Sequence, residues 1–321
     1  MNILITGATG FVGSHMVDYI LKYAIRPDQK VYCTKRWMED TKNLDHINHD
    51  SFEYIDCDLL DGMSVKRAVE ISKPEKVFHF AAQSFPEVSF KIPVITLQTN
   101  IIGTTHLLES IKESDYDPTI VSVSSSEVYG NPNEDEIPIT ETNPIRPANP
   151  YSISKVGHDL MSQYYYKAYG MKIIITRMFS HEGARRGKQF ALSSFAYQIA
   201  KNEKLKGDGV VKHGNLDSVR TYNHIEDAIQ AYWLCSNSDK YGEVYNIGGD
   251  YTCTVGEALD MLISKSTNNH TKELDPERVR PTDITLQIPS SEKFRNDFGW
   301  RPRKSLTHIC DDLLDYWRKN I

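Results

Sequence analysis

The apolar residues in the first half of the chain fall into short runs, separated by longer stretches with helical spacing. The runs have the length and composition of buried strands and lie at residues 2–6, 30–34, 53–55, 76–82, 119–123 and 172–177. Apolar side chains recur with the period of a helix at residues 11–21, 64–72 and 94–110. Alternation of strands with helices of this length predicts an α/β fold, a doubly wound parallel sheet of the Rossmann type.

The second half of the chain has a weaker pattern. From His181 onward the periodicity fades and charged residues become more frequent, until a helical pattern returns at residues 306–317. We therefore expect a Rossmann domain at residues 1–178 that also holds the catalytic residues. A smaller substrate-binding part is expected at residues 179–321, with some of its segments returning to the sheet.

Composition and charge narrow the class of protein. The 321 residues carry a formal net charge of -6, which argues against wholesale nucleic-acid binding. No apolar run approaches the roughly 18 residues that span a bilayer, and the N-terminus lacks the basic region of a signal peptide. The five cysteines are scattered and form no CxxC pair, so we expect a cytoplasmic protein with neither disulfides nor a metal site.

A glycine-rich turn joins the first strand to the first helix. Its sequence, Gly7-Ala8-Thr9-Gly10-Phe11-Val12-Gly13, has the spacing GxxGxxG. Backbone N–H groups at a helix N-terminus attract a pyrophosphate, and glycines allow the backbone to approach it closely. The turn therefore predicts a dinucleotide site, and a tight turn without a ligand is the weaker alternative.

The second strand ends in the cations Lys35 and Arg36. In NAD-binding sites an Asp or Glu usually stands here and bonds the ribose hydroxyls. Cations at this position would instead meet the 2′-phosphate of NADP, so we expect NADP in preference to NAD. The alternative interpretation is a solvated basic turn.

Tyr151 and Lys155 are spaced so that, on a helix, they lie one turn apart on the same face. The phenol of an isolated Tyr has a pKa of about 10, and a neighbouring ammonium lowers that pKa. A Tyr tuned in this way can take a proton from a substrate hydroxyl or return it. Because most such pairs are solvated surface, this one becomes a catalytic candidate only together with the dinucleotide site.

Two further motifs follow strands whose carboxyl ends meet at one edge of the predicted sheet. Ala81-Ala82-Gln83 follows the fourth strand, and Ser124-Ser125-Ser126-Glu127 follows the fifth. Ligands of doubly wound sheets bind beyond this edge, so both motifs are expected at the dinucleotide site.

With these motifs in this order, the chain resembles the extended short-chain dehydrogenase/reductase superfamily. The matching residues are 6–13, Asp58-Leu59, 80–83, Ser124-Ser125, and Tyr151 with Lys155. The resemblance implies a role for each motif in binding the cofactor. Its contacts would be Gly7, Thr9, Gly10, Phe11, Val12, Gly13, Asp58, Leu59, Ala81, Ala82 and Gln83. Ser125 would hold the substrate hydroxyl, Tyr151 would be the acid/base, and Lys155 would bond the nicotinamide ribose.

Within the superfamily the chain resembles the GDP-mannose 4,6-dehydratases. The matching segments are 81–90, 124–130, 177–187 and 214–220. This resemblance implies that Arg185 or Arg186 reaches a cofactor phosphate, either in the same subunit or in a neighbouring one, and it supplies a set of substrate contacts. These contacts would be Ser84, Glu127, Ser180, Asn215, Arg220 and Arg280. Ser125 stands where the family usually has Thr, and Ser180 where it has Asn, so GDP-mannose and GDP-N-acetylglucosamine both stay open as substrates.

The cofactor and the Ser–Tyr–Lys set fit three enzymes of nucleotide sugars: 4-epimerases, 4-keto reductases and 4,6-dehydratases. A dehydratase needs a further acid/base group near C5 and C6, and Glu127 is the candidate, with Ser126 assisting. We therefore expect a GDP-hexose 4,6-dehydratase, with the reductase or the epimerase as the alternative. A non-catalytic NADP-binding regulator is disfavoured, because Ser125, Tyr151 and Lys155 are all present. Superfamily members often dimerise through the helices that start near residues 94 and 151, so a homodimer or homotetramer is expected.

Overall fold

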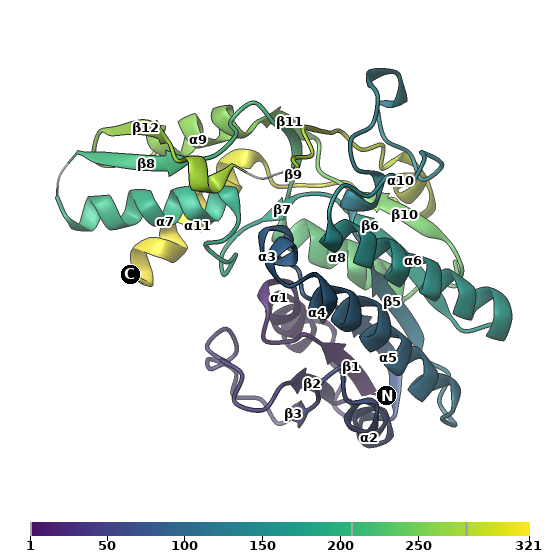
Figure 1. Cartoon of the computed structure of the whole chain (residues 1–321). Coiled ribbons are helices and arrows are strands. Elements are labelled where there is room, and N and C mark those ends of the chain that lie inside the picture. Colours follow the sequence, from purple (N-terminus) through teal and green to yellow (C-terminus); the bar gives the residue numbers. More distant parts are fainter. Residues whose placement is uncertain (1, 207, 280–281) are drawn as a thin grey trace. The chain divides into compact units, whose positions relative to one another are not determined.

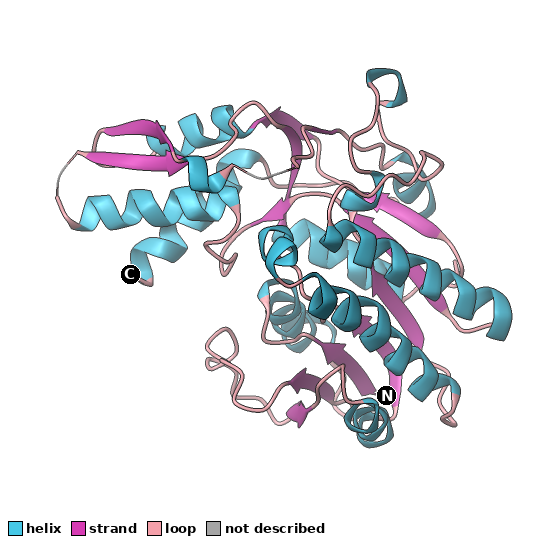
Figure 2. Ribbon diagram, viewed as in Figure 1, coloured by secondary structure: helices cyan, strands magenta, loops and turns pink. Residues whose placement is uncertain are grey.

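The computed structural model describes residues 2–206, 208–279 and 282–321 (Figure 1; Figure 2). Within these residues, seven strands form one sheet in the order β10-β6-β5-β4-β1-β2-β3. The strands are β1 (Asn2–Thr6), β2 (Val31–Lys35), β3 (Phe52–Asp56), β4 (Pro74–His79), β5 (Thr119–Val123), β6 (Ile173–Met178) and β10 (Val244–Ile247). Pairs from β3 across to β6 are parallel, which confirms the predicted doubly wound sheet.

Helices cover both faces of this sheet. They are α1 (Phe11–Tyr19), α2 (Gly62–Ser72), α3 (Pro86–Lys91), α4 (Pro93–Leu97), α5 (Gly103–Lys112), α6 (Pro150–Tyr169) and α8 (Ile225–Ser236). On one face α4 and α5 pack against α6, and α2 packs against α5. On the other face, Tyr19 of α1 packs on Trp233 of α8, with ring centroids 5.9 Å apart. Because helices lie on both faces, all six residues of β6 are buried, as expected for an inner parallel strand.

The expected helix at 94–110 is not a single regular α-helix. It consists of α4, a π-helical turn η2 (Gln98–Ile102) and α5. A π turn of this kind often marks a functional position in a helix. Here it holds Asn100, a buried residue that contacts the site described below.

A second group of elements builds a separate hydrophobic core. Its strands are β7 (His181–Glu182), β8 (Gly209–His213), β9 (Val219–His224), β11 (Tyr251–Thr254), β12 (His270–Leu274) and β13 (Leu286–Gln287). Its helices are α7 (Ala191–Lys204), α9 (Val255–Ser264), α10 (Glu292–Phe298) and α11 (Leu306–Lys319). Buried apolar side chains of α7, α9 and α11 pack together with Tyr222 of β9.

The chain divides into two compact units, and neither is a single stretch of sequence. Unit 1 comprises residues 1–128, 149–177 and 229–245, and unit 2 comprises residues 129–148, 178–228 and 246–321. The division expected at residue 178, with some later segments returning to the sheet, stays a prediction. In the part of the chain that the structure describes, no helix has both the length and the apolar composition needed to cross a bilayer.

Candidate active site

The glycine turn lies between the end of β1 and the start of α1. Gly7 has φ +68°, and a Cβ added there would lie 2.7 Å from the backbone nitrogen of Ala81. A Cβ at Gly13 would lie 2.2 Å from the Gly7 carbonyl oxygen. The N-cap position of α1 is Gly10, which has no side chain to cap the helix. The first-turn N–H groups of α1 are thus presented to a ligand, as a dinucleotide pyrophosphate requires.

The Ala81-Ala82-Gln83 motif is fixed next to this turn. The Ala81 N–H donates to the Thr6 hydroxyl (3.2 Å), which ties the end of β4 to the end of β1. The Gln83 N–H donates to Asn100 Oδ1 (2.8 Å), and Asn100 Nδ2 donates in turn to Ser154 Oγ on α6 (2.8 Å). Asn100 therefore links the predicted cofactor motif to the helix that carries Tyr151 and Lys155, a link that the sequence pattern did not reveal.

A pocket of about 490 Å³ lies at the carboxyl ends of β2 and β3. Its lining residues are Arg36, Trp37, Met38, Glu39, Asp56, Cys57, Asp58, Asp61, Ser64 and Arg67. Lys35 does not line it; its ammonium pairs with the carboxylate of Asp56 at 2.5 Å. Arg67 of α2, which the sequence analysis missed, does line it and donates to the Asp56 backbone carbonyl (3.0 Å).

The pocket suits the adenosine end of a dinucleotide. Asp58, the expected adenine contact, forms part of the wall, and Leu59 beside it is buried. Two guanidinium groups, from Arg36 and Arg67, line the pocket together with four carboxylates, and Arg36 pairs with Glu39 at 3.3 Å. No local sequence signal marks Arg67, because it reaches the pocket only through the packing of α2 beside β3.

The helix α6 presents the Tyr–Lys pair. Asn149 is its N-cap, and its side chain accepts a hydrogen bond from the Ser152 N–H (2.8 Å). Lys155 is 4% exposed, and its ammonium donates to the Val123 carbonyl at the end of β5 (2.5 Å). Burial lowers the pKa of Lys155 to about 8, so the ammonium is still the major form at neutral pH.

Ser125, Ser126 and Glu127 follow β5, and the last two begin a short 3-10 turn, η3 (Ser126–Tyr129). The Glu127 N–H donates to Ser125 Oγ (3.2 Å). The Glu127 carboxylate accepts a hydrogen bond from Asn149 Nδ2 (3.0 Å). Asn149 thus caps α6 and holds Glu127 with the same side chain. The sequence motifs did not predict a role for Asn149. The signal that could have revealed it is its place directly before Pro150, which is typical of a helix N-cap.

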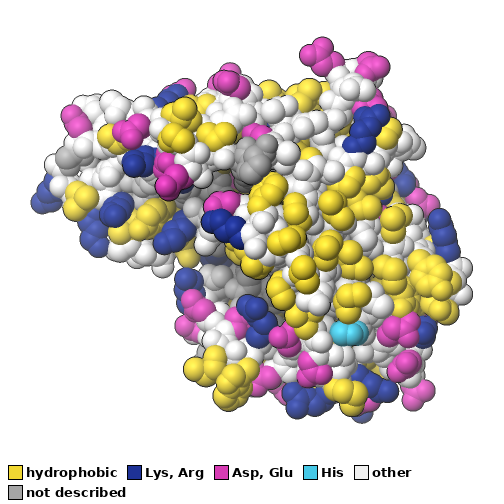
Figure 3. Space-filling model, viewed as in Figure 1, with side chains coloured by type: hydrophobic (Ala, Val, Ile, Leu, Met, Phe, Trp, Pro, Cys, Tyr) yellow, Lys and Arg dark blue, Asp and Glu magenta, His cyan; other side chains and the backbone are white. Residues whose placement is uncertain are grey.

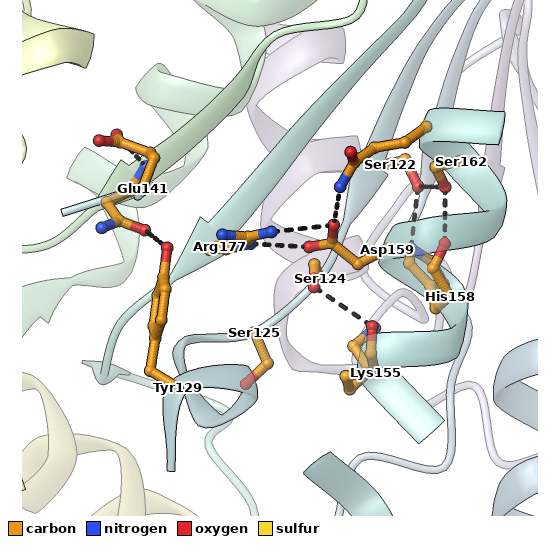
Figure 4. Close-up of polar contacts among 12 residues, drawn as sticks. Ser122, Ser124, Ser125, Tyr129, Glu141, Lys155, His158, Asp159, Ser162 and Arg177 are labelled. Carbon is orange, nitrogen blue, oxygen red and sulfur yellow. Dashed lines mark hydrogen bonds and ion pairs between the residues drawn. The ribbon is translucent and has the colours of Figure 1, made fainter. Parts of the chain in front are cut away.

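A buried polar network lies near Lys155, and Figure 4 shows the end of it at His158 and Ser122. It runs from Thr6 through His79, Thr104 and His158 to Ser122, with each successive pair of atoms 2.7–2.9 Å apart. Burial lowers the pKa of His79 to about 3, and burial together with Lys155 lowers the pKa of His158 well below its usual value. Both imidazoles are therefore neutral at physiological pH and act as hydrogen-bonding links between strands and helices.

Two of the expected substrate residues of unit 2, Asn215 and Arg220, contact Asp283. Asn215 Nδ2 donates to the Asp283 carboxylate (3.1 Å), and the Arg220 guanidinium lies 3.9 Å from the same carboxylate. Ser180 accepts a hydrogen bond from the Asn223 N–H through its backbone carbonyl (2.8 Å). Arg280 lies outside the described residues. Ser84 directly follows Gln83 in unit 1.

The loop after β7 contains the expected phosphate ligand Arg185, which adopts φ +68°. The neighbouring Arg186 pairs with Glu182 at 3.5 Å and stacks on the Phe190 ring at 3.4 Å. Burial raises the pKa of Glu182 to about 7, although Arg186 opposes the shift. Arg186 thus makes its contacts within unit 2, and a phosphate contact through Arg185 or Arg186 stays a prediction.

One group of potential metal ligands, His224, Glu226 and Asp312, comes together in the described part of unit 2. The Glu226 N–H donates to His224 Nδ1 (3.1 Å), so the ring proton lies on Nε2, which faces Asp312 at 2.8 Å. A hydrogen bond between imidazole and carboxylate accounts for this arrangement without an ion.

A glycine-turn Rossmann sheet with a Tyr–Lys pair on α6 defines an enzyme of the extended short-chain dehydrogenase/reductase class, as the sequence predicted. A family model described as GDP-mannose 4,6 dehydratase matches residues 4–313. The chain therefore belongs to the GDP-mannose 4,6-dehydratase family, and its class, nucleotide-sugar 4,6-dehydratase, is the predicted one.

Individual relatives differ in substrate and reaction. The dTDP-D-glucose 4,6-dehydratase of Homo sapiens is 29% identical over 330 residues, covering 99% of this chain and 90% of the relative. The GDP-6-deoxy-D-mannose reductase of Pseudomonas aeruginosa is 25% identical over 319 residues, covering 99% and 98%. The structure of the dTDP-glucose 4,6-dehydratase DesIV of Streptomyces venezuelae, with NAD and TYD bound, matches with a TM-score of 0.86 at 25% identity, covering 100% of this chain and 98% of that one.

Proposed function

We propose that this protein converts a GDP-hexose, either GDP-mannose or GDP-N-acetylglucosamine, into the 4-keto-6-deoxy sugar. The observation that carries the proposal is the hydrogen bond between Glu127 and Asn149, the residue that caps α6. This bond holds an acid/base group near the start of the helix that bears Tyr151. Such a second group, distinct from Tyr151, is what loss of water across C5 and C6 requires.

Each proposed catalytic residue handles a proton at a stated atom of the sugar. Tyr151 takes the proton of the C4 hydroxyl, and Ser125 holds that hydroxyl in place. The ketone formed at C4 acidifies C5, so Glu127 can remove the C5 proton. Glu127 then protonates the departing C6 hydroxyl, with Ser126 assisting, so the proton from C5 leaves in the water. C5 finally takes up one proton, which balances the proton that Tyr151 removed from the C4 hydroxyl.

NADP is the proposed cofactor, and when bound it accepts the C4 hydride and returns it to C6. Support comes from the glycine turn and from the pocket lined by Arg36 and Arg67. The relative solved with NAD supports a nicotinamide dinucleotide in general. We assign the binding of the 2′-phosphate to Arg36 and Arg67. Lys35 acts indirectly, because its ammonium pairs with the carboxylate of Asp56, a residue that lines the pocket.

Replacing Arg36 or Arg67 with Gln is expected to weaken NADP binding about tenfold and to leave NAD binding nearly unchanged. A hydrogen bond to a charged group contributes about 1.5–3 kcal/mol, and about 1.4 kcal/mol corresponds to a factor of ten. Isothermal titration with each dinucleotide measures the effect. Lys66→Gln is the matched control, because Lys66 is adjacent on α2 but pairs with Glu113 outside the pocket. Equal losses for NAD and NADP would contradict the assignment.

The substrate diphosphate is proposed to bind Asn215, Arg220 and Arg280, with Ser84 and Ser180 contacting the sugar. Asn215 and Arg220 share Asp283 as a partner, so their side chains are directed to one locality of unit 2. The family model favours a GDP-sugar, while the human relative acts on a dTDP-sugar. Incubation with a panel of GDP-, dTDP- and UDP-hexoses, without added cofactor, followed by mass spectrometry tests the function. The proposal expects a GDP-hexose to lose water.

The alternative functions are a GDP-4-keto-6-deoxy-sugar reductase and a 4-epimerase. The reductase is favoured among them by the relative from Pseudomonas aeruginosa. A reductase consumes one NADPH for each 4-keto sugar and loses no water, whereas an epimerase leaves the mass of the sugar unchanged. The same mass-spectrometric panel, extended to 4-keto sugars with NADPH, separates the three reactions.

A homodimer is proposed through an apolar surface on α4, η2 and α6. Its exposed side chains include Val94, Ile95, Ile102, Ile153 and Leu160. Figure 3 shows hydrophobic side chains gathered over this part of unit 1. Exposed apolar patches of this kind mark protein–protein contacts. A tetramer would add the contact of the Arg185 loop with a neighbouring cofactor.

The double substitution Ile153→Asp and Leu160→Asp is expected to convert the dimer into monomers, because two charges would be buried without partners. Size-exclusion chromatography with light scattering measures the mass, for which one chain accounts for 36.7 kDa. Leu205→Asp is the control, since Leu205 is also an exposed apolar residue but lies in unit 2. A wild-type protein that is already monomeric would exclude the proposed dimer.

We also propose a cytoplasmic location without nucleic-acid or membrane partners. All five cysteines fall within the described residues, and each is buried with a free thiol. Burial raises the thiol pKa of Cys57 and Cys253 to about 11, so these groups resist oxidation.

A further inference from the structure

Directly behind the Tyr–Lys pair lies a buried ion pair that the proposed reaction does not use. Asp159 is fully buried on α6, one turn beyond Lys155. The Arg177 guanidinium of β6 donates to both of its carboxylate oxygens, from Nε at 2.8 Å and from Nη2 at 3.1 Å. Gln163 Nε2 adds a third hydrogen bond at 2.7 Å. Figure 4 shows this group beside Lys155.

The surroundings of Lys155 contain few charges. Tyr151 lies one turn before it on α6, and the two imidazoles that face it, His158 of α6 and His79 of β4, are neutral. From β5, the group that contacts the Lys155 ammonium is the backbone carbonyl of Val123. Burial acts to remove the proton from Lys155, and Asp159 acts in the opposite direction. Arg177 approaches Asp159 from β6 and fixes its orientation.

We propose that Asp159, oriented by Arg177 and Gln163, is a positioning residue for Lys155 whose buried carboxylate keeps the ammonium charged next to Tyr151. This inference rests on the proposed function for the role of Lys155, but not on the identity of the sugar. Without the carboxylate, a buried ammonium with only a carbonyl as its partner would lose its proton near neutral pH. Tyr151 would then lack the positive charge that favours its ionised form.

A purely structural role is the competing explanation. A buried ion pair costs desolvation energy, and well-packed apolar residues could join α6 to β6 at least as well. Asp159 lies one helical turn from Lys155, so its negative charge can stabilise the Lys155 ammonium, which an apolar residue could not do. The two explanations differ in one measurable quantity, the protonation of Lys155.

The test is a direct titration of Lys155 by NMR. Protein labelled with ¹³C at the lysine side chains is titrated, and the Lys155 Cε signal is assigned by its loss in Lys155→Met. The wild type is expected to titrate near pH 8, and Asp159→Asn about 1 to 3 units lower. Asp159→Glu keeps the charge and is expected to titrate close to the wild type. At pH 7 the kcat/KM of Asp159→Asn should fall about tenfold, because most Lys155 is then neutral.

Two further variants keep the result interpretable. The double variant Asp159→Asn/Arg177→Gln leaves no unpaired charge and serves if Asp159→Asn does not fold. Its Lys155 titration is expected to shift in the same direction by a smaller amount, because the opposing charge of Arg177 is lost as well. Ser162→Ala, a change on the same helix as Lys155, removes a hydrogen bond to Ser122 of β5 and should lower the Tm without moving the Lys155 titration. An unshifted titration in Asp159→Asn, or in the double variant if Asp159→Asn does not fold, would overturn the proposal, as would a wild-type Lys155 that is neutral at pH 7. If no nucleotide sugar is dehydrated but the titration shifts, the proposed function fails and this inference stands.

Discussion

Glu127→Gln is expected to lower dehydration by about 10²- to 10⁴-fold while NADP binding stays intact, because the amide can neither remove the C5 proton nor protonate the C6 hydroxyl. The Gln side-chain oxygen can still accept the hydrogen bond from Asn149, so the loop should keep its conformation. Mass spectrometry follows water loss, and isothermal titration follows NADP binding.

The Glu127 variant should still oxidise C4. In a single turnover with NADP loaded, the nicotinamide absorbance of the reduced form should rise and persist, because the next step is blocked. Glu134→Gln is the matched control, an exposed Glu seven positions later in the short turn η4 (Glu134–Glu136). Full dehydratase activity in Glu127→Gln would refute the assignment of Glu127 and with it the preference for a dehydratase.

Tyr151→Phe is expected to lower the overall rate by a similar 10²- to 10⁴-fold, but at an earlier step. Phe fills nearly the same space and cannot take the C4 hydroxyl proton, so no reduced cofactor should form in a single turnover. This absence distinguishes it from Glu127→Gln, in which reduced cofactor should accumulate. The pair of variants thus separates the redox step from the elimination.

Tyr169→Phe is the control for the tyrosine substitution. Tyr169 is half exposed at the last position of α6, and its hydroxyl lies 3.3 Å from that of Tyr164. The variant should retain the wild-type rate. If Tyr151→Phe retained it as well, another group would have to act as the acid/base at C4.

The sequence predicted those features that depend on local pattern. The order of strands and helices, the position of the glycine turn and the placement of Tyr151 and Lys155 on one helix follow from periodicity and from short motifs. Each is determined within a few residues of chain. The superfamily and family followed from the same motifs and are confirmed.

Features that depend on packing between distant segments were not predictable in this way. Arg67 reaches the dinucleotide pocket because α2 lies beside β3, and Asn149 meets Glu127 across 22 positions of sequence. The pairing of Lys35 with Asp56 joins two neighbouring strands and cannot be read from either one. Residues 229–245, which belong to unit 1 although they come from the second half of the chain, also take their place through packing between distant segments.

The buried pair of Asp159 and Arg177 illustrates the limit most clearly. In the sequence, Asp159 is one polar residue of an amphipathic helix, and Arg177 ends a strand otherwise rich in isoleucine. Only the fold brings the two together and buries them beneath Lys155. A buried charge needs a partner of opposite charge, and that partner is known only from the tertiary structure. The role of such a residue therefore cannot be predicted from its local sequence.

The most direct test of the proposed reaction follows a deuterium atom placed at C4 of the sugar that loses water in the substrate panel. A 4,6-dehydratase takes the label from C4 and returns it to C6 of the same molecule. The account predicts a 4-keto-6-deoxy product that has lost one water and carries the deuterium at C6, formed without added NADPH. A product that keeps the label at C4, or a reaction that proceeds only as NADPH is consumed and without loss of water, would contradict it.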